Sequence, residues 1–208
     1  QFFIEGKRLV QSVLGLSAKI DSVYFTDPFR IENMEMVDSV QNSDISFEQI
    51  PTKQFSKISF TQSPSGIGAV CRLPDQGKAD LDQNKWLYQD NISDPGNMGT
   101  LFRSAAWFNF THVALSLGCV DPFNPKVVRA GMGAHFGLTI QPNIELNLFA
   151  DSHILVAADH RGNDLSDFKV PDKFVLVLGS EAHGLSDSVR KRLDETISIE
   201  KTGFGESL

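Results

Sequence analysis

A polar loop at residues 91–103, with the sequence NISDPGNMGTLFR, carries the side chains best suited to chemistry. Its residues 94–97 are typical of a turn, and the apolar residues that follow predict a buried helix. Residues 85–89 predict a strand, so the loop joins a strand end to a helix start. Open α/β sheets bind ligands at such positions, and helix N-termini attract anions. Arg103 lies one to two turns inside this helix, so its charge must find a partner or face a cleft.

Two further polar segments follow this loop in the same order as the motifs of a known family. Residues 176–186 read LVLGSEAHGLS, and residues 197–208 read ISIEKTGFGESL. The loop at 91–103 fits the pattern Asn-x-x-Asp-Pro-x-Asn-x-Gly-x-x-x-Arg. Together the three segments resemble the signatures of the SpoU (TrmH-like) RNA ribose 2′-O-methyltransferases, members of the knotted SPOUT superfamily. The resemblance covers essentially the whole chain and is sharpest from Trp86 onward.

The resemblance implies that Arg103, Asn97, Glu181 and Ser207 are the catalytic residues. Arg103 would act at the target ribose; if its role is structural instead, it would cap the core or form an ion pair with Asp94. A guanidinium stays protonated in proteins, so we do not expect Arg103 to act as a base. We expect it to bind the adjacent phosphate and to stabilise the negative charge that develops on the 2′-oxygen. Asn97 would bond across the site or a dimer interface, or cap the helix. Glu181 would orient Arg103 or the substrate, or serve as a capping carboxylate.

The family resemblance also implies a site for S-adenosylmethionine, held largely by backbone groups. The residues that match its cofactor contacts are Gly179, Ile199, Leu208, Leu178 and Gly184. Glu200-Lys201 replaces the Pro-Met that is familiar in the third motif, and the family's final helix lies beyond residue 208. Arg129 and Arg103 are the candidate RNA contacts. The histidines lack ligand spacing, so we expect no metal.

Composition limits the classes of protein that this chain can represent. The 208 residues carry 19 Lys and Arg against 26 Asp and Glu, a net charge of −7. Residues 1–83 and 84–208 are each acidic, so neither half is a generally basic RNA-binding module, and any phosphate contact needs a local patch. No apolar run predicts a membrane span and no signal peptide is visible, so we expect a cytoplasmic protein, with the mitochondrion as the alternative.

The pattern of elements predicts an α/β fold in two parts. Residues 1–73 predict a small α/β domain, which the resemblance identifies as ribosomal-protein-like and RNA-binding; residues 74–83 predict a linker. Residues 84–208 predict a parallel sheet covered on both faces, and the resemblance implies a SPOUT methyltransferase domain with a trefoil knot. The expected strands are 22–25, 45–47, 66–71, 86–89, 113–116, 154–158, 174–178 and 196–199. The expected helices begin at about residues 3, 31, 51, 98, 125, 165 and 186.

These observations predict a methyltransferase that acts on the ribose 2′-hydroxyl of RNA, with rRNA favoured by the separate N-terminal domain. The nearer alternative is the same reaction on tRNA. An alternative of another class is a non-catalytic RNA-binding protein with a degenerate methyltransferase fold, which the acidic charge and Glu200-Lys201 favour. Family members are homodimers, so we expect a homodimer, with Trp107 or Phe108 either buried in its interface or packed in the core.

Overall fold

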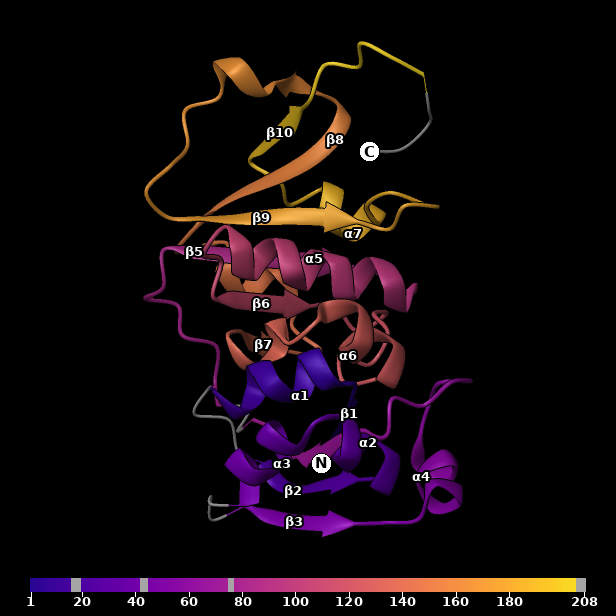
Figure 1. The fold of residues 1–208 in the computed structure, drawn as a ribbon. Coiled ribbons are helices and arrows are strands. Elements are labelled where there is room, and N and C mark those ends of the chain that lie inside the picture. The colour runs from indigo at the N-terminus through magenta and orange to yellow at the C-terminus, as the bar shows by residue number, and fades with distance from the viewer. Residues whose placement is uncertain (16–19, 42–44, 75–76, 205–208) are drawn as a thin grey trace.

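Two β-sheets, one from each half of the chain, lie one above the other along the long axis of the molecule (Figure 1). This is a computed structural model, and it describes residues 1–15, 20–41, 45–74 and 77–204. The first sheet has four strands in the order β1-β4-β2-β3, and the second has six in the order β10-β8-β9-β5-β6-β7. The mixed α/β fold expected from the sequence is therefore confirmed.

The N-terminal sheet mixes parallel and antiparallel pairs. Strand β2 pairs parallel to β3 and antiparallel to β4, and β4 also pairs antiparallel to β1. Its elements are β1 (Phe2–Glu5), α1 (Lys7–Leu14), β2 (Ile20–Phe25), α2 (Asp27–Glu32), α3 (Met34–Gln41), β3 (Ser46–Gln49), α4 (Thr52–Ile58) and β4 (Ile67–Cys71).

The helix expected from residue 3 was wrong at its start, because residues 2–5 form strand β1. Phe2 and Ile4 alternate into the core, and the strand pairs with β4 from Phe2 to Glu5. The helix begins only at Lys7, after Gly6 with φ 108°. Asp27 and Pro28 form the first turn of α2, since Thr26 caps that helix and proline fits its start.

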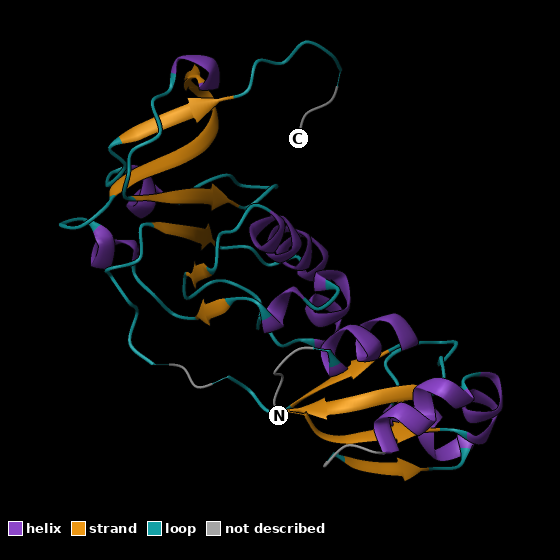
Figure 2. Ribbon diagram, turned by 60° about the vertical axis from the view of Figure 1, so that its left-hand side comes forward, coloured by secondary structure: helices purple, strands orange, loops and turns teal. Residues whose placement is uncertain are grey.

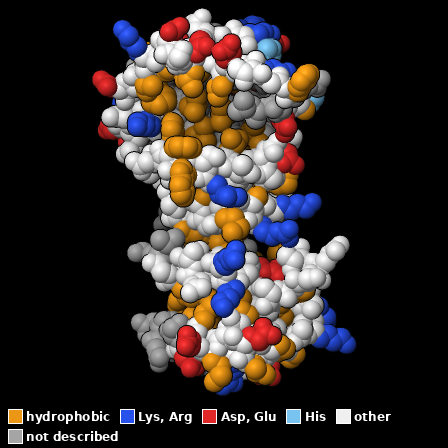
Figure 3. Space-filling model, turned by 45° about the horizontal axis from the view of Figure 1, so that its top comes forward, with side chains coloured by type: hydrophobic (Ala, Val, Ile, Leu, Met, Phe, Trp, Pro, Cys, Tyr) orange, Lys and Arg blue, Asp and Glu red, His pale blue; other side chains and the backbone are white. Residues whose placement is uncertain are grey.

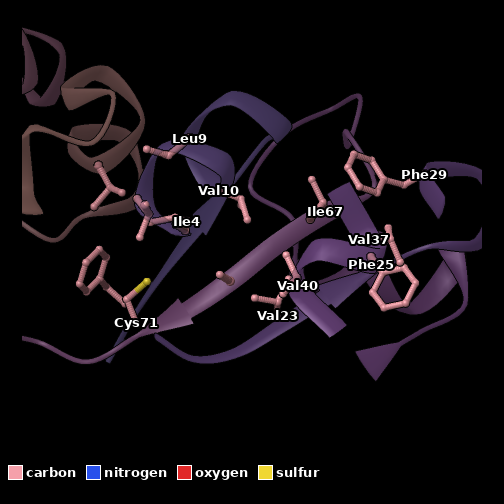
Figure 4. Packing of buried hydrophobic residues seen from close by; sticks show 14 residues of the cluster. Ile4, Leu9, Val10, Val23, Phe25, Phe29, Val37, Val40, Ile67 and Cys71 are labelled. Carbon is pink, nitrogen blue, oxygen red and sulfur yellow. The ribbon is translucent and has the colours of Figure 1, made fainter. Parts of the chain in front are cut away.

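The core of the N-terminal unit continues into the second half of the chain. Ile4, Leu9 and Val10 pack on one side of β4, and Phe25, Phe29 and Val37 lie further along the same sheet (Figure 4). Val128 of the second unit belongs to this cluster, and Phe123 and Phe136 pack against it. The two units therefore share one apolar interface.

All pairs in the second sheet are parallel, and successive residues on each strand face opposite sides. One face packs on α5 and α6, which Figure 2 shows on one side of the strands; the opposite face packs on a 3₁₀ helix, Leu146–Phe149, and on α7. The elements are β5 (Lys85–Asp90), α5 (Pro95–Trp107), β6 (His112–Leu115), α6 (Pro125–Gly131), β7 (Thr139–Gln141), β8 (Ile154–Asp164), β9 (Phe174–Gly179), α7 (Asp187–Arg190) and β10 (Glu195–Ser198).

Five expected strands of this half are confirmed, one expected helix needs correction and one strand was not expected. The helix expected at residue 165 is a single 3₁₀ turn, Leu165–Asp167, whereas the helix expected at about residue 186 is confirmed as the one-turn α7. Strand β7 was missed because three residues are too short to show a pattern. Within the described residues, no helix is long and apolar enough to cross a membrane.

Helices α5 and α6 meet at a glycine. A Cβ built on Gly99 would lie 2.4 Å from the Ala130 Cβ, 2.7 Å from the Val127 carbonyl oxygen and 2.8 Å from the Gly131 nitrogen. Real Cβ atoms do not approach backbone so closely, so only glycine lets the two helices touch. The motif glycine at this position is therefore explained by packing.

Replacing Gly99 with alanine is expected to destabilise the protein by about 1–3 kcal/mol, because two backbones must separate. At about 2–4 °C per kcal/mol for a chain of this size, calorimetry would detect the drop in melting temperature. Gly137→Ala is the matched control, since its nearest neighbour would lie at 3.8 Å. Equal melting temperatures for the two variants would contradict the packing argument.

Candidate active site

The first two polar motifs lie at the carboxyl ends of adjacent parallel strands. Strand β5 leads into the loop at 91–94 and its neighbour β9 leads into the loop at 180–186. The buried Asp90 carboxylate accepts hydrogen bonds from the Ser186 backbone N–H at 2.6 Å and the Asn91 side chain at 3.0 Å. Asp90 thus ties together two loops that are far apart in sequence.

The start of α5 presents Asn97 to the second loop. Asp94 caps the helix by accepting the Asn97 backbone N–H at 2.8 Å, so the alternative in which Asn97 is the cap was wrong. The Asn97 Nδ2 instead donates to Glu181 Oε2 at 2.6 Å. Glu181 therefore bonds to Asn97, and this contact joins the first and second motifs.

The second loop is closed by backbone contacts. Ser180 and Gly184 exchange two backbone hydrogen bonds, at 2.7 Å and 3.0 Å, and Gly184 has φ +66°. A Cβ on Gly179 would lie 2.5 Å from the Gly184 carbonyl carbon and 2.7 Å from the Leu185 nitrogen. Both glycines are thus required by the shape of the loop.

A cavity of about 900 Å³ lies beside these loops, on the α5 side of the sheet. Five residues expected in the site line it: Asn97, Leu178, Gly179, Glu181 and Ile199. Its other walls include Leu101, Leu176 and Ile197, and Figure 3 shows hydrophobic side chains gathered on the upper half of one face. The cavity has the size and apolar character of a small-molecule site.

Arg103 does not line this cavity. It is exposed on α5, one turn beyond the cavity residue Thr100, and residues three apart are neighbours on a helix surface. No hydrogen bond or ion pair joins it to another described residue, and the Asp94 carboxylate is used by the cap, so the pairing alternative is not seen. Arg129 is exposed on α6, away from the cavity, and Ser207 and Leu208 lie outside the described residues.

Comparison with known proteins identifies the family of the chain. Residues 85–208 match the SpoU rRNA Methylase family, and residues 3–76 match the family described as RNA 2′-O ribose methyltransferase substrate binding. The chain belongs to the SpoU rRNA methylase family. This membership confirms the resemblance read from the motifs.

Individual SpoU relatives agree with this assignment. RlmP of Bacillus subtilis, a 23S rRNA guanosine 2′-O-methyltransferase, is 28% identical over all of this chain and 82% of its own length. The mitochondrial rRNA methyltransferase 3 of Mus musculus is 34% identical over 70% of this chain, which spans only 36% of that relative. The SpoU methyltransferase AviRb of Streptomyces viridochromogenes, solved in complex with AdoMet, has a similar fold, with a TM-score of 0.83. The match covers all of this chain and 83% of the AviRb chain, and the two sequences are 21% identical.

One charged residue of the cavity wall, Asp159, and its ion-pair partner Arg190 were missed from the sequence. Asp159, at the carboxyl end of the core part of β8, lines the cavity with a side chain only 7% exposed. Arg190 of α7 donates to Asp159 Oδ2 at 2.7 Å and to the Leu185 carbonyl oxygen at 3.1 Å, so it links β8 to the second loop. Bonds from Arg161, and then from Arg190, hold the pKa of Asp159 well below its ordinary value, against the effect of burial. Its position at the end of a parallel strand was the available signal.

Replacing Asp159 with asparagine is expected to lower the melting temperature at pH 7, because Arg190 then loses its charged partner. A carboxyl whose pKa is depressed by folding stabilises the native state above its unfolded pKa, and this contribution disappears as the pH falls through the folded pKa. The difference between wild type and Asp159→Asn should therefore shrink below about pH 4. Asp151→Asn, at an exposed carboxylate, is the control; a difference that stays constant from pH 7 to pH 3 would contradict the role of the ion pair.

Proposed function

We propose that this SpoU family member transfers a methyl group from S-adenosylmethionine to a ribose 2′-hydroxyl of RNA, with rRNA as the substrate class. The observation that carries the proposal is the Asn97–Glu181 hydrogen bond, which joins the two motif loops at the wall of the apolar cavity. Membership of the family and the rRNA activity named for the Bacillus subtilis relative support it.

The residues of the cavity fit S-adenosylmethionine. Leu101, Leu178 and Ile199 offer apolar surface to an adenine, and Gly179 brings backbone to the wall. The cofactor carries a cationic sulfonium. The described residues that line the cavity include the carboxylates of Asp159 and Glu181 but no Lys or Arg, so the charge of the wall suits a cation. When bound, S-adenosylmethionine supplies the activated methyl group. We assign Leu178, Gly179, Gly184, Ile199 and Leu208 to its binding.

The chain's own residues would align the two substrates. Arg103 stands on the solvent side of α5 next to the cavity wall, where it can bind the phosphate beside the target ribose and stabilise negative charge on the 2′-oxygen. The bond between Asn97 and Glu181 would hold α5 against the second motif loop. The side of the site that binds RNA would then keep a fixed distance from the side that binds the cofactor. Ser207 remains a proposed contact.

We retain residues 1–73 as the RNA-recognition domain, 74–83 as the linker and 84–208 as the methyltransferase domain with a trefoil knot. The substrate-binding family match over residues 3–76 supports the first assignment.

A homodimer is part of the proposal: Trp107 is 85% and Phe108 70% exposed, so packing in the core of this chain is not their role. Sedimentation as a monomer at micromolar concentration would contradict it. A cytoplasmic location remains a prediction, since bacterial and mitochondrial relatives both match.

Incubation of the protein with labelled S-adenosylmethionine and unmodified rRNA or tRNA tests the proposal, with mass spectrometry to locate any 2′-O-methyl group. Transfer to a single rRNA nucleotide is expected. Transfer to tRNA alone would show that the substrate is tRNA and not rRNA. Binding of RNA without methyl transfer to rRNA or tRNA would identify a non-catalytic RNA-binding protein.

A further inference from the structure

Three helices lie side by side across the junction of the two units. α5 touches α6 at Gly99, and Val128 of α6 belongs to the apolar cluster of the N-terminal unit. Just beyond α6, a Cβ on Gly133 would lie 3.3 Å from Leu9 Cδ1 and 3.5 Å from Ser12 Oγ of α1. Helix α6 is therefore flanked by α5 on one side and α1 on the other.

The charge of these three helices is opposite to that of the chain. α1, α5 and α6 contain five of the 19 Lys and Arg residues and none of the 26 Asp and Glu residues. The rest of the chain is correspondingly more acidic than its net charge of −7 suggests. The local basic patch that the composition required is thus concentrated on one set of neighbouring helices.

Four of these cations share the solvent side of the helices. Arg103 is exposed one turn after Gly99, the residue that touches α6. Lys126 and Arg129 are exposed on α6, opposite its buried side. Arg8 is exposed on α1 one turn before Ser12, which faces Gly133. In Figure 3, Lys and Arg side chains follow one another down the middle of the molecule from its upper to its lower half.

No carboxylate of a described residue forms an ion pair with any of these four cations. Among the described residues, Arg8, Arg103, Lys126 and Arg129 form no ion pair, whereas the Arg72 and Arg190 side chains do. The acidic residues nearest to α5 and α6 in sequence, Asp94 and Asp121, accept backbone N–H groups instead. The four charges therefore remain available to an external polyanion.

We propose that Arg8, Arg103, Lys126 and Arg129 form a basic track that binds the phosphates of one RNA strand as it passes from the N-terminal unit to the candidate active site. The track rests on the proposed function, and it begins at the residue assigned to the phosphate beside the target ribose. Successive phosphates give RNA a line of negative charge, which matches a line of cations better than it matches a compact site. Because Arg8 belongs to one unit and the other three to the second, the bound strand also fixes how the two units present the RNA.

Charge reversal at two positions of the track other than Arg103, one on α1 and one on α6, tests this inference without altering the residues assigned to catalysis. Arg8→Glu and Arg129→Glu would be compared with Lys57→Glu, an exposed lysine on α4, which Figure 1 shows apart from α6. An unmodified rRNA transcript is the probe, titrated at several salt concentrations. Each track variant should weaken binding about tenfold and reduce the slope of log affinity against log salt by about 0.7–1, because one phosphate contact is lost. Cofactor affinity should stay at the wild-type value.

The outcomes separate the track from the proposed function. Wild-type affinity and slope in both track variants, or an equal loss in Lys57→Glu, would overturn the track and leave the methyltransferase proposal standing. Absence of rRNA binding by the wild-type protein would overturn both. The neutral variants Arg8→Gln and Arg129→Gln, checked by circular dichroism, provide the same readout if a reversed charge prevents folding.

Discussion

Replacing Arg103 with alanine is expected to lower the rate of methyl transfer about 10²–10³-fold, the effect of removing one donor from a developing oxyanion. The affinity for S-adenosylmethionine should remain unchanged, because Arg103 does not line the cavity and bonds to no other described residue. Single-turnover transfer to the mapped rRNA and calorimetric titration of the cofactor measure the two effects separately.

Two control variants define the role of the Arg103 guanidinium. Ser104→Ala, an exposed change on the same helix, should retain activity and would reveal a general effect on α5. Arg103→Lys keeps the charge but loses the paired donors of the guanidinium, so partial rescue is expected. Loss of cofactor binding together with transfer in Arg103→Ala would contradict the separation between an RNA side and a cofactor side.

Replacing Gly179 with alanine is expected to weaken S-adenosylmethionine binding about 10–100-fold, since relieving an overpacked contact costs about 1–3 kcal/mol. The new methyl group would meet the backbone of Gly184 and Leu185 at 2.5–2.7 Å, and neither can move without opening the pairing of Ser180 with Gly184. The same shift would displace Glu181, which lies between them and bonds to Asn97.

The matched control for Gly179 is Gly15→Ala, whose Cβ would find its nearest neighbour at 3.7 Å. It should bind the cofactor like the wild type. Wild-type affinity in Gly179→Ala as well, with an unchanged melting temperature, would show that the second loop accepts a side chain and would remove the steric basis of this assignment.

Local pattern alone determined the motif loops and most of the second sheet. The continuous apolar run from Phe174 to Leu178 can be buried only between two layers, and it forms the β9 strand of the parallel sheet. The turn chemistry of residues 94–97 begins a helix within three residues of the expected position. These features depend on neighbours in sequence, so they are visible without the fold.

Only the tertiary structure decided which of these residues meet. β1 is a strand because β4, more than 60 residues away, offers it an edge, although its own sequence continues into a helix. Asn97 bonds to Glu181 across 84 residues, and Arg190 reaches Asp159 across 31. The need for glycine at position 99 follows from the backbone of a second helix, whose position no local pattern contains. Such contacts depend on strand order and helix packing, which are long-range consequences of burying the whole apolar surface at once.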